Sequence, residues 1–440
     1  ATVRSVLRRT EGPGTAGRTG AREKVIRMSS DTAPPDVRAS RLSRDELEAN
    51  FADQHPPLSR SEALIEADRC YFCYDAPCTT ACPTGIDVPA FIQKIRSDNI
   101  RGSARTILGE NIMGGMCARV CPTEVLCEEA CVRNTHEEKP VEIGLLQRYA
   151  TDPIIDAGTQ LFPRASSSGK KVAVVGGGPA GLSCAHRLAV LGHDVVIFDR
   201  AEKPGGLNEY GIAAYKTVDD FAQIEVNYIL SVGGIEVRHN MALGEDVQLP
   251  ELIAGFDAVF LGIGLGQSNN LGIDGEDKDD VINAIDYIAD LRQADDKSKL
   301  PVGKTVVVIG GGMTAIDIAV QSRHLGAQQV HMVYRRGPEK MSASMFEQAL
   351  AQTSGVTLHH RAPPKRILGD GHVTGVEFES DGGKFVLYCD MVFKAIGQQM
   401  EGIGDIDMQN GRIVVDDGHR TSLPKVWAGG DCVVGGDDLT

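Results

Sequence analysis

The chain has 440 residues, enough for about three domains of roughly 150 residues each. Its formal net charge of −15 excludes the broadly basic surface that general nucleic-acid binding requires. No stretch approaches the roughly 18 uninterrupted apolar residues of a membrane span. No secretory segment is recognisable either, so a reducing compartment is expected. The sequence therefore predicts a multidomain, soluble, cytoplasmic protein.

The first 27 residues form a leader with seven basic and two acidic side chains. Such a composition is typical of an organellar transit peptide, but translation from upstream of a true start at Met28 is the simpler interpretation. We therefore expect residues 1–27 to be a non-native leader outside the fold. Residues 29–60 are polar and contain two Pro-Pro pairs, which predicts an arm leading into the first domain.

Eight of the eleven cysteines lie between Cys70 and Cys131, where apolar spacing predicts helices from Ser61 to about Asp156. Their pattern is C-x2-C-x4-C-x3-C-P followed by C-x3-C-P-x4-C-x3-C. Thiolates this dense in a chain without a secretory segment indicate metal. The pattern has one C-x2-C and two cysteines before proline. It favours two four-iron, four-sulfur clusters, with structural zinc as the alternative.

A first strand–turn–helix unit follows a polar hinge at residues 166–169. The apolar run 172–175 precedes the turn Gly176-x-Gly178-x-x-Gly181, and Asp199 ends the next apolar run. Glycines allow the pyrophosphate of a dinucleotide to approach a helix N-terminus, and the acid can bind ribose hydroxyls. Because strand, turn, helix and acid occur together, the unit predicts a dinucleotide site.

A second unit begins 134 residues later with Gly310-x-Gly312-x-x-Ala315, between an apolar run at 305–309 and a predicted helix at 314–325. The alanine-ended turn is expected for a nicotinamide nucleotide. Arg335 and Arg336 stand where an acid would select NAD, and guanidinium groups suit a 2′-phosphate. The alternative is a solvated surface pair, so the choice between NAD and NADP stays open.

Together, these motifs resemble the region shared by dihydropyrimidine dehydrogenase, its bacterial electron-input subunit and the glutamate synthase small subunit. The resemblance runs from about Leu58 to Thr440 and implies interleaved metal ligands. One [4Fe-4S] cluster is implied at Cys70, Cys73, Cys78 and Cys131, and the other at Cys82, Cys121, Cys127 and Gln147. Cys117 is then surplus, and we expect it to be a small buried hydrophobe.

The resemblance also implies the nucleotide-binding residues. For FAD they are Val120, Gly176, Gly178, Pro179, Ala180, Gly181, Asp199, Gly205, Gly206, Leu207, Lys216, Gly430 and Asp431. For NAD(P)H they are Gly310, Gly311, Gly312, Met313, Thr314, Ala315, Arg335, Arg336, Ala395, Ile396 and Gly397. Ser342 stands where the NADP-dependent relative has a further arginine. No catalytic acid or base is expected for the hydride step.

The expected fold class is multidomain, α plus α/β. A helical double-[4Fe-4S] domain (residues 28–168) precedes two Rossmann-like domains. FAD binds at residues 169–266 and 397–440, and an inserted NAD(P) domain occupies 267–396. The family continues beyond residue 440 into a helix that packs at the flavin. We therefore expect this chain to lack that helix.

The implied function is an electron-transfer oxidoreductase subunit in pyrimidine catabolism. Electrons would pass from NAD(P)H through FAD and the clusters to an FMN-containing, iron–sulfur TIM-barrel subunit that reduces uracil or thymine. One alternative is a glutamate synthase small subunit feeding a large subunit. Another, of a different class, is a zinc-stabilised interaction protein without redox activity.

Overall fold

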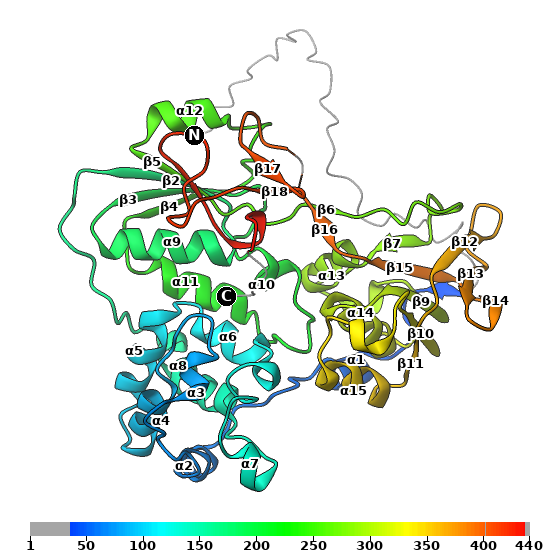
Figure 1. Cartoon of the computed structure of the whole chain (residues 1–440), viewed down its shortest axis with the longest axis horizontal. Coiled ribbons are helices and arrows are strands. Elements are labelled where there is room, and N and C mark those ends of the chain that lie inside the picture. The colour runs from blue at the N-terminus through cyan, green and yellow to red at the C-terminus, as the bar shows by residue number, and fades with distance from the viewer. Residues whose placement is uncertain (1–35, 401, 436–440) are drawn as a thin grey trace, which may run out of the picture. The chain divides into compact units, whose positions relative to one another are not determined.

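The structure, a computed structural model, describes residues 36–400 and 402–435 (Figure 1). The predicted leader (1–27) and the Pro34-Pro35 pair lie outside these ranges. From Pro34 onward the chain forms one compact unit. A search of the described residues finds no helix with the length and apolar character needed to cross a membrane. The predicted mixture of a helical segment with α/β sheets is present.

The first part of the compact unit is helical, as the apolar spacing predicts. Its helices are α2 (Arg60–Asp68), α3 (Pro77–Thr80), α4 (Val88–Arg96), α5 (Ile100–Glu110), α6 (Gly114–Val120), α7 (Asn134–Glu137) and α8 (Ile143–Asp156). Ser59 begins α2 through a capping box with Glu62. Phe91 and Ile95 of α4 pack with Leu146 of α8 in an apolar cluster, which fixes the segments that carry the cysteines.

The first sheet is fully parallel, with strand order β19-β5-β2-β3-β4. Its strands are β2 (Lys171–Val175), β3 (Asp194–Phe198), β4 (Ile235–Arg238), β5 (Ala258–Leu261) and β19 (Val426–Ala428). The accompanying helices are α9 (Pro179–Val190), α10 (Leu207–Tyr210), α11 (Phe221–Leu230) and α12 (Leu249–Gly255). Crossover helices cover a parallel sheet, so the central strands β2 and β3 are buried on both faces over four successive residues.

The second sheet is also parallel, with strand order β11-β10-β9-β15-β7. Its strands are β7 (Val281–Asn283), β9 (Thr305–Gly310), β10 (Gln329–Val333), β11 (Val356–His359) and β15 (Met391–Ala395). Helices α13 (Ala284–Gln293), α14 (Met313–His324) and α15 (Met345–Thr353) accompany it. A separate antiparallel sheet contains β12 (Pro364–Leu368), β13 (Gly375–Ser380) and β14 (Gly383–Leu387).

Two connections join the sheets and run side by side. Strand β6 (Gln267–Ser268) leaves the first sheet, and β16 (Gln398–Gln399) returns to it; the two pair antiparallel. A short hairpin, β17 (Met408–Gln409) and β18 (Arg412–Ile413), follows the return. The second sheet is thus built entirely from chain that lies between β5 and β19 of the first.

The helical segment shares an apolar core with the first sheet. Met116 of α6 and Ile155 of α8 belong to the same buried cluster as Val174 of β2 and Phe221 and Ile229 of α11. In Figure 1, α6 and α8 accordingly lie beside α11. This shared core holds the cysteine-bearing helices against the first glycine turn.

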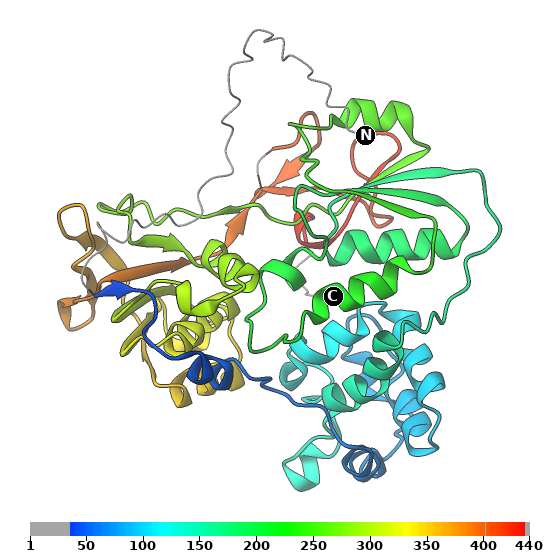
Figure 2. The same ribbon diagram turned by 180° about the vertical axis from the view of Figure 1, so that it is seen from behind.

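The predicted N-terminal arm differs from expectation because it contains regular structure. Strand β1 (Val37–Arg38) pairs antiparallel with β8 (Val302–Gly303), beside the second sheet (Figure 2). Helix α1 (Arg44–Asn50) starts at a capping box between Ser43 and Glu46. This pattern is a sequence signal for a helix start, but the prediction of an irregular arm relied on the proline pairs. Residues 36–50, which the prediction assigns to the helical domain, therefore contact the second sheet's unit.

Candidate functional site

The first glycine turn lies between β2 and the N-terminus of α9. Gly176 has φ +98°, and a Cβ there would lie 2.3 Å from the Gly262 carbonyl oxygen. A Cβ on Gly181 would lie 1.9 Å from the Gly176 carbonyl oxygen. Both positions therefore require glycine, and the turn leads directly into the N-terminus of α9, whose N-cap is Gly178. This arrangement suits a pyrophosphate.

Asp199, at the end of β3, is buried beside this turn. Its carboxylate accepts hydrogen bonds from the backbone N–H of Gly177 at 2.5 Å and of Ala201 at 2.6 Å. These contacts fix the acid at the mouth of the turn, where the sequence pattern predicts a ribose contact. The placement agrees with the pattern, and the ribose contact remains a proposal.

Two distant glycine segments close around the same helix N-terminus. A Cβ on Gly206 would lie 2.7 Å from the Gly178 Cα, and one on Gly430 would lie 2.8 Å from the Ala180 Cβ. Gly206 has φ +54° and Gly430 has φ +76°. Residues 205–207 and 429–431, including Asp431, are thus brought to the turn, as the resemblance implies for FAD. This cradle of glycines fits a dinucleotide that requires close backbone approach.

The second glycine turn opens onto a cavity of about 740 Å³. The residues predicted for a nicotinamide nucleotide line it: Gly310, Gly311, Gly312, Met313, Thr314, Arg335, Arg336, Ala395, Ile396 and Gly397. Ala315 lies beneath, fully buried; a Cβ on Gly310 would lie 3.1 Å from its Cβ. Arg335 and Arg336 are exposed at the cavity and follow β10, as expected of groups that bind a nucleotide phosphate.

Two further residues line this cavity: Ser342, which bears on the choice of nucleotide, and Lys394, which the sequence analysis missed. Ser342 lines the cavity together with both arginines, so the cavity has a polar hydroxyl at that point. Lys394, at the end of β15, also lines it and forms an ion pair with Glu276 at 2.9 Å. No motif marks Lys394; its position follows only from the pairing of β15 with β9.

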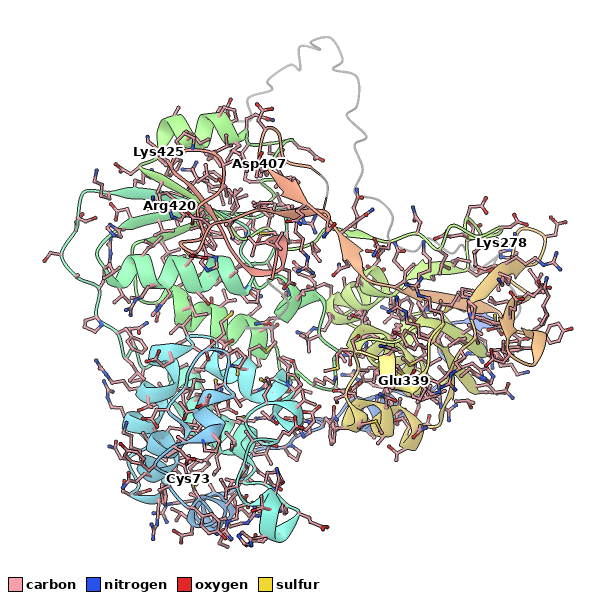
Figure 3. All side chains as sticks on the ribbon, viewed as in Figure 1. Cys73, Lys278, Glu339, Asp407, Arg420 and Lys425 are labelled. Atoms are coloured by element: carbon pink, nitrogen blue, oxygen red, sulfur yellow. The ribbon has the colours of Figure 1, made fainter. Side chains whose placement is uncertain are left out.

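The four cysteines assigned to the first cluster come together. Cys70, Cys73, Cys78 and Cys131 line one cavity of about 30 Å³ in the helical segment, where Figure 3 labels Cys73. Burial, followed by the neighbouring Cys70 and Cys131, raises the pKa of the Cys78 thiol to about 11. Apolar side chains of Val88, Ile92 and Ile143 complete the lining. All eleven cysteines are free thiols.

The cysteines assigned to the second cluster also interact. Burial raises the pKa of Cys127, and nearby Cys117 and Cys82 add to it. Cys117, then burial, raises the pKa of Cys121, with smaller contributions from Cys127 and Cys82. Among the residues that the structure describes, no group of three or more metal-binding side chains is arranged to hold a single ion. Two separate sets of thiols are what two clusters would need.

Gln147 and Cys117 both lie at this second set. Gln147 is buried on α8, and its Nε2 donates to the Gly114 carbonyl at 2.7 Å. A hydrogen bond from Cys121 lowers the pKa of Cys117 against the effect of burial, and Gln147 and Asn111 lower it further. Cys117 therefore has hydrogen-bonding neighbours, whereas the sequence predicted a small buried hydrophobe at this position.

A small cavity of about 20 Å³ joins the second cysteine set to the first glycine turn. Cys117, Val120 and Cys121 line it from the helical segment, and Pro179 and Ser183 line it from α9. Val120 is thus placed as the resemblance implies. Asn111 and Asn208, which also line the cavity, carry no sequence motif and were not predicted.

Lys216 is buried in an ion-pair network. Its ammonium lies 2.8 Å from the Asp317 carboxylate and 2.7 Å from that of Glu347. Burial lowers its pKa, but the two carboxylates outweigh this effect and raise it overall. The side chain contacts α14 and α15, so its predicted role at the flavin remains a proposal beside an observed structural one.

Two family descriptions match the chain. The pyridine nucleotide-disulphide oxidoreductase family matches residues 170–439, which contain both glycine turns. The description "dihydropyrimidine dehydrogenase domain II, 4Fe-4S cluster" matches residues 47–159, which contain all eight clustered cysteines.

Curated relatives are similar over most of their length. The chain is 32% identical to the NAD-dependent dihydropyrimidine dehydrogenase subunit PreT of Escherichia coli (strain K12), over 88% of this chain and 92% of that protein. It is 34% identical to the small chain of glutamate synthase [NADPH] from the same organism, over 88% and 90%.

A solved structure supports the fold alone. FprA of Mycobacterium tuberculosis in complex with NADPH covers 60% of this chain and 79% of its own, with 19% identity and a TM-score of 0.51.

Proposed function

We propose, because the chain belongs to the pyridine nucleotide-disulphide oxidoreductase family and carries a 4Fe-4S domain, that it is the electron-input subunit of a larger redox enzyme. It would oxidise NAD(P)H and deliver single electrons to a partner. The observation that carries this proposal is the small cavity at which the second cysteine set meets the N-terminus of α9. Two redox sites separated by one layer of side chains suit electron transfer between them.

The residues around the first turn fit FAD. The glycines at 176, 181, 206 and 430 leave room for backbone to approach a ligand, and Asp199 is fixed at the same point. FAD bound at this turn would accept the two electrons of a hydride, and 4Fe-4S clusters bound at the two cysteine sets would carry these electrons one at a time. The chain's own residues provide position: Pro179 and Ser183 hold one site against Cys117 and Cys121.

The second cavity fits a nicotinamide nucleotide, and its positive charges favour a nucleotide that carries a 2′-phosphate. The N-terminus of α14 presents backbone N–H groups to a pyrophosphate. Arg335 and Arg336 offer planar donors to a 2′-phosphate. One relative is named as NAD-dependent and the other by NADPH, so the arginines decide our preference for NADP(H).

The partner that we propose is an FMN-containing, iron–sulfur TIM-barrel subunit that reduces uracil or thymine. Both relatives named above are described as subunits or small chains, which supports a hetero-oligomer. Gln147 supports the pyrimidine enzyme, since the resemblance to dihydropyrimidine dehydrogenase implies a glutamine as the fourth ligand of the second cluster. The similarity to the glutamate synthase small chain keeps a glutamine-dependent partner as the second candidate.

The test begins with anaerobically prepared protein that contains iron, acid-labile sulfide and FAD. Addition of NADPH should bleach the flavin absorbance, and dithionite should produce electron paramagnetic resonance signals of reduced clusters. A colourless protein with zinc in place of iron would instead support the interaction-protein alternative. Mixing with the barrel subunit, followed by assays with uracil or with 2-oxoglutarate and glutamine, separates the two partners.

A further inference from the structure

A carboxyl group is buried at the contact between the second cysteine set and the first sheet's unit. Glu225 of α11 is 1% exposed. Its Oε1 accepts hydrogen bonds from the backbone N–H of Gly115 and of Met116, both at 2.9 Å. Its Oε2 has no hydrogen-bond partner within the described ranges. Both donors belong to α6, the helix that contains Cys117 and ends at Val120, directly before Cys121.

The packing around this carboxyl is close. A Cβ on Gly115 would lie 2.6 Å from the Phe221 ring and 2.9 Å from the Glu225 Oε1, so only glycine allows this contact. The Arg119 guanidinium lies over the Phe221 ring, 3.3 Å from its centroid. These contacts fix α6 on α11, and Glu225 supplies their polar part.

The charges near Glu225 leave its carboxylate without a cation of its own. The Arg119 guanidinium lowers the pKa of Glu225, but it makes two hydrogen bonds to Asp152 of α8, at 2.8 and 2.9 Å. The Cys117 thiol of α6 also acts on Glu225 electrostatically and raises its pKa. The helices packed against α11 also carry titratable side chains. These are Arg148, Asp152 and Asp156 of α8, Cys184, His186 and Arg187 of α9, and Glu209 of α10. Helix α11 itself carries Tyr228 as well.

Burial raises the pKa of Glu225 to about 8, although the two N–H donors and Arg119 lower it and Cys117 raises it slightly. The group therefore stands near the point at which a small change in nearby charge alters its protonation. An added negative charge in a low-dielectric interior favours the neutral acid. An electron that arrives at the second cysteine set is such a charge.

We propose that Glu225 is a positioning residue that also takes up one proton when the second cysteine set receives an electron. The inference rests on the proposed function, because the electron comes from NAD(P)H through that cysteine set's cluster. Above about pH 8, where Glu225 is a carboxylate before reduction, the cluster would gain one electron, the Glu225 carboxylate would gain one proton from solvent, and a carboxylic acid would form. No covalent bond between heavy atoms changes. The electron in the helical segment and the proton on Glu225 of α11 together leave the net charge of the chain unchanged.

The experiment measures the midpoint potential of the second cluster by electron paramagnetic resonance, with the FAD- and iron-loaded full chain, from pH 6.5 to 9.5. Within part of this range the unmodified chain should show a tenfold change in the one-electron equilibrium per pH unit, which corresponds to about 59 mV. The variant Glu225→Gln keeps an oxygen that accepts both N–H groups but cannot titrate, so its potential should not vary with pH. The control Glu251→Gln, exposed on α12, should keep the slope.

Three results would overturn the inference: a potential independent of pH in the unmodified chain, an unchanged slope in Glu225→Gln, or an equal loss in the control. Infrared difference spectra of the unmodified chain provide a measurement that needs no variant. Reduction should produce the C=O band of one newly protonated carboxyl, and absence of this band contradicts the proposal. If dithionite produces no cluster signal at all, the proposed function fails instead, which separates the two failures.

The positioning role has its own readout. Glu225→Leu leaves the N–H groups of Gly115 and Met116 buried without an acceptor, at a cost of about 1–3 kcal/mol each. We therefore expect lower iron content and a lower Tm in Glu225→Leu, and recovery of both in Glu225→Gln. Equal iron content in all three proteins would contradict this role.

Discussion

The Lys216 ammonium lies 2.7 Å from the Glu347 carboxylate, although 131 residues separate the two in the chain. Asp317 lies 2.8 Å from the same ammonium. The pair connects the segment after α10 to α15 of the second sheet's unit, and its charges are almost completely buried. Buried ion pairs depend on both partners, because either one alone is an uncompensated charge.

The first prediction concerns this pair. Lys216→Met should lower the free energy of unfolding by about 3–5 kcal/mol, because two carboxylates then remain buried without a cation. Urea unfolding of the full chain measures the change. Lys299→Met, at a side chain that is 81% exposed, is the control and should stay within about 0.5 kcal/mol. Unchanged stability with a selective loss of FAD would instead favour the flavin contact that the family resemblance implies for Lys216.

The second prediction concerns the first glycine turn. Gly181→Ala should abolish FAD retention and lower the free energy of unfolding by about 1–3 kcal/mol, because its Cβ would overlap the Gly176 carbonyl oxygen. Flavin absorbance after gel filtration, together with Tm, measures both effects. A Cβ on Gly255, at the end of α12, meets nothing within 4 Å. Gly255→Ala should therefore keep its flavin, and equal flavin loss in both variants would contradict the placement of FAD at this turn.

These two predictions differ in how far the sequence reveals them. Gly176, Gly178 and Gly181 stand in one contiguous motif, and their conformational requirement follows from local backbone geometry. The turn could therefore be predicted from the sequence. The presence of metal in the cysteine block could also be predicted, because eight thiols lie so close together in the chain. Their division into two ligand sets followed from the family resemblance and not from their spacing.

Contacts between distant segments could not be predicted in this way. Lys216 is an ordinary lysine in the sequence, and Glu225 is the single acid of the mostly apolar helix α11, with no motif around it. Their partners lie 131 and 109 residues away, and only the packing of whole units brings them together. Cys117 was misjudged for the same reason: its contact with Gln147 depends on how α6 packs against α8.

The third prediction concerns nucleotide choice. Arg335→Ala and Arg336→Ala should each raise the KM for NADPH about 10- to 100-fold, because a charge-assisted hydrogen bond is worth about 1.5–3 kcal/mol. The KM for NADH should change little, since NADH lacks the 2′-phosphate. Steady-state reduction of ferricyanide by the loaded chain measures both constants.

The control for this prediction is Arg361→Ala. Arg361 is exposed and lies 3.8 Å from Glu339, outside the lining of the cavity. It should leave both KM values unchanged. If the KM values for NADH and NADPH rise equally in the Arg335 and Arg336 variants, the arginines contact a part that both nucleotides share, and the preference for NADP(H) is wrong.

The fourth prediction concerns acid sensitivity and rests on His186 of α9. This imidazole is 5% exposed and packs edge-on against Phe162, with ring centroids 5.6 Å apart. Its Nε2 has no hydrogen-bond partner in the part of the chain that the structure describes. Burial, with a smaller effect of Arg187, lowers its pKa from 6.5 to about 4. The folded chain therefore keeps His186 neutral at pH values where the unfolded chain protonates it.

A depressed histidine pKa makes stability fall as the pH decreases. The contribution of His186 is complete above about pH 6.5 and is lost progressively as the pH falls towards 4. At pH 5 the loss is about 2 kcal/mol, since each pH unit below 6.5 costs about 1.4 kcal/mol. His186→Leu should therefore lose less stability than the unmodified chain between pH 7 and pH 5, as measured by urea unfolding at each pH. His239→Leu, at an exposed position, should retain the full loss, and an equal pH dependence in both variants would show that His186 does not govern this transition.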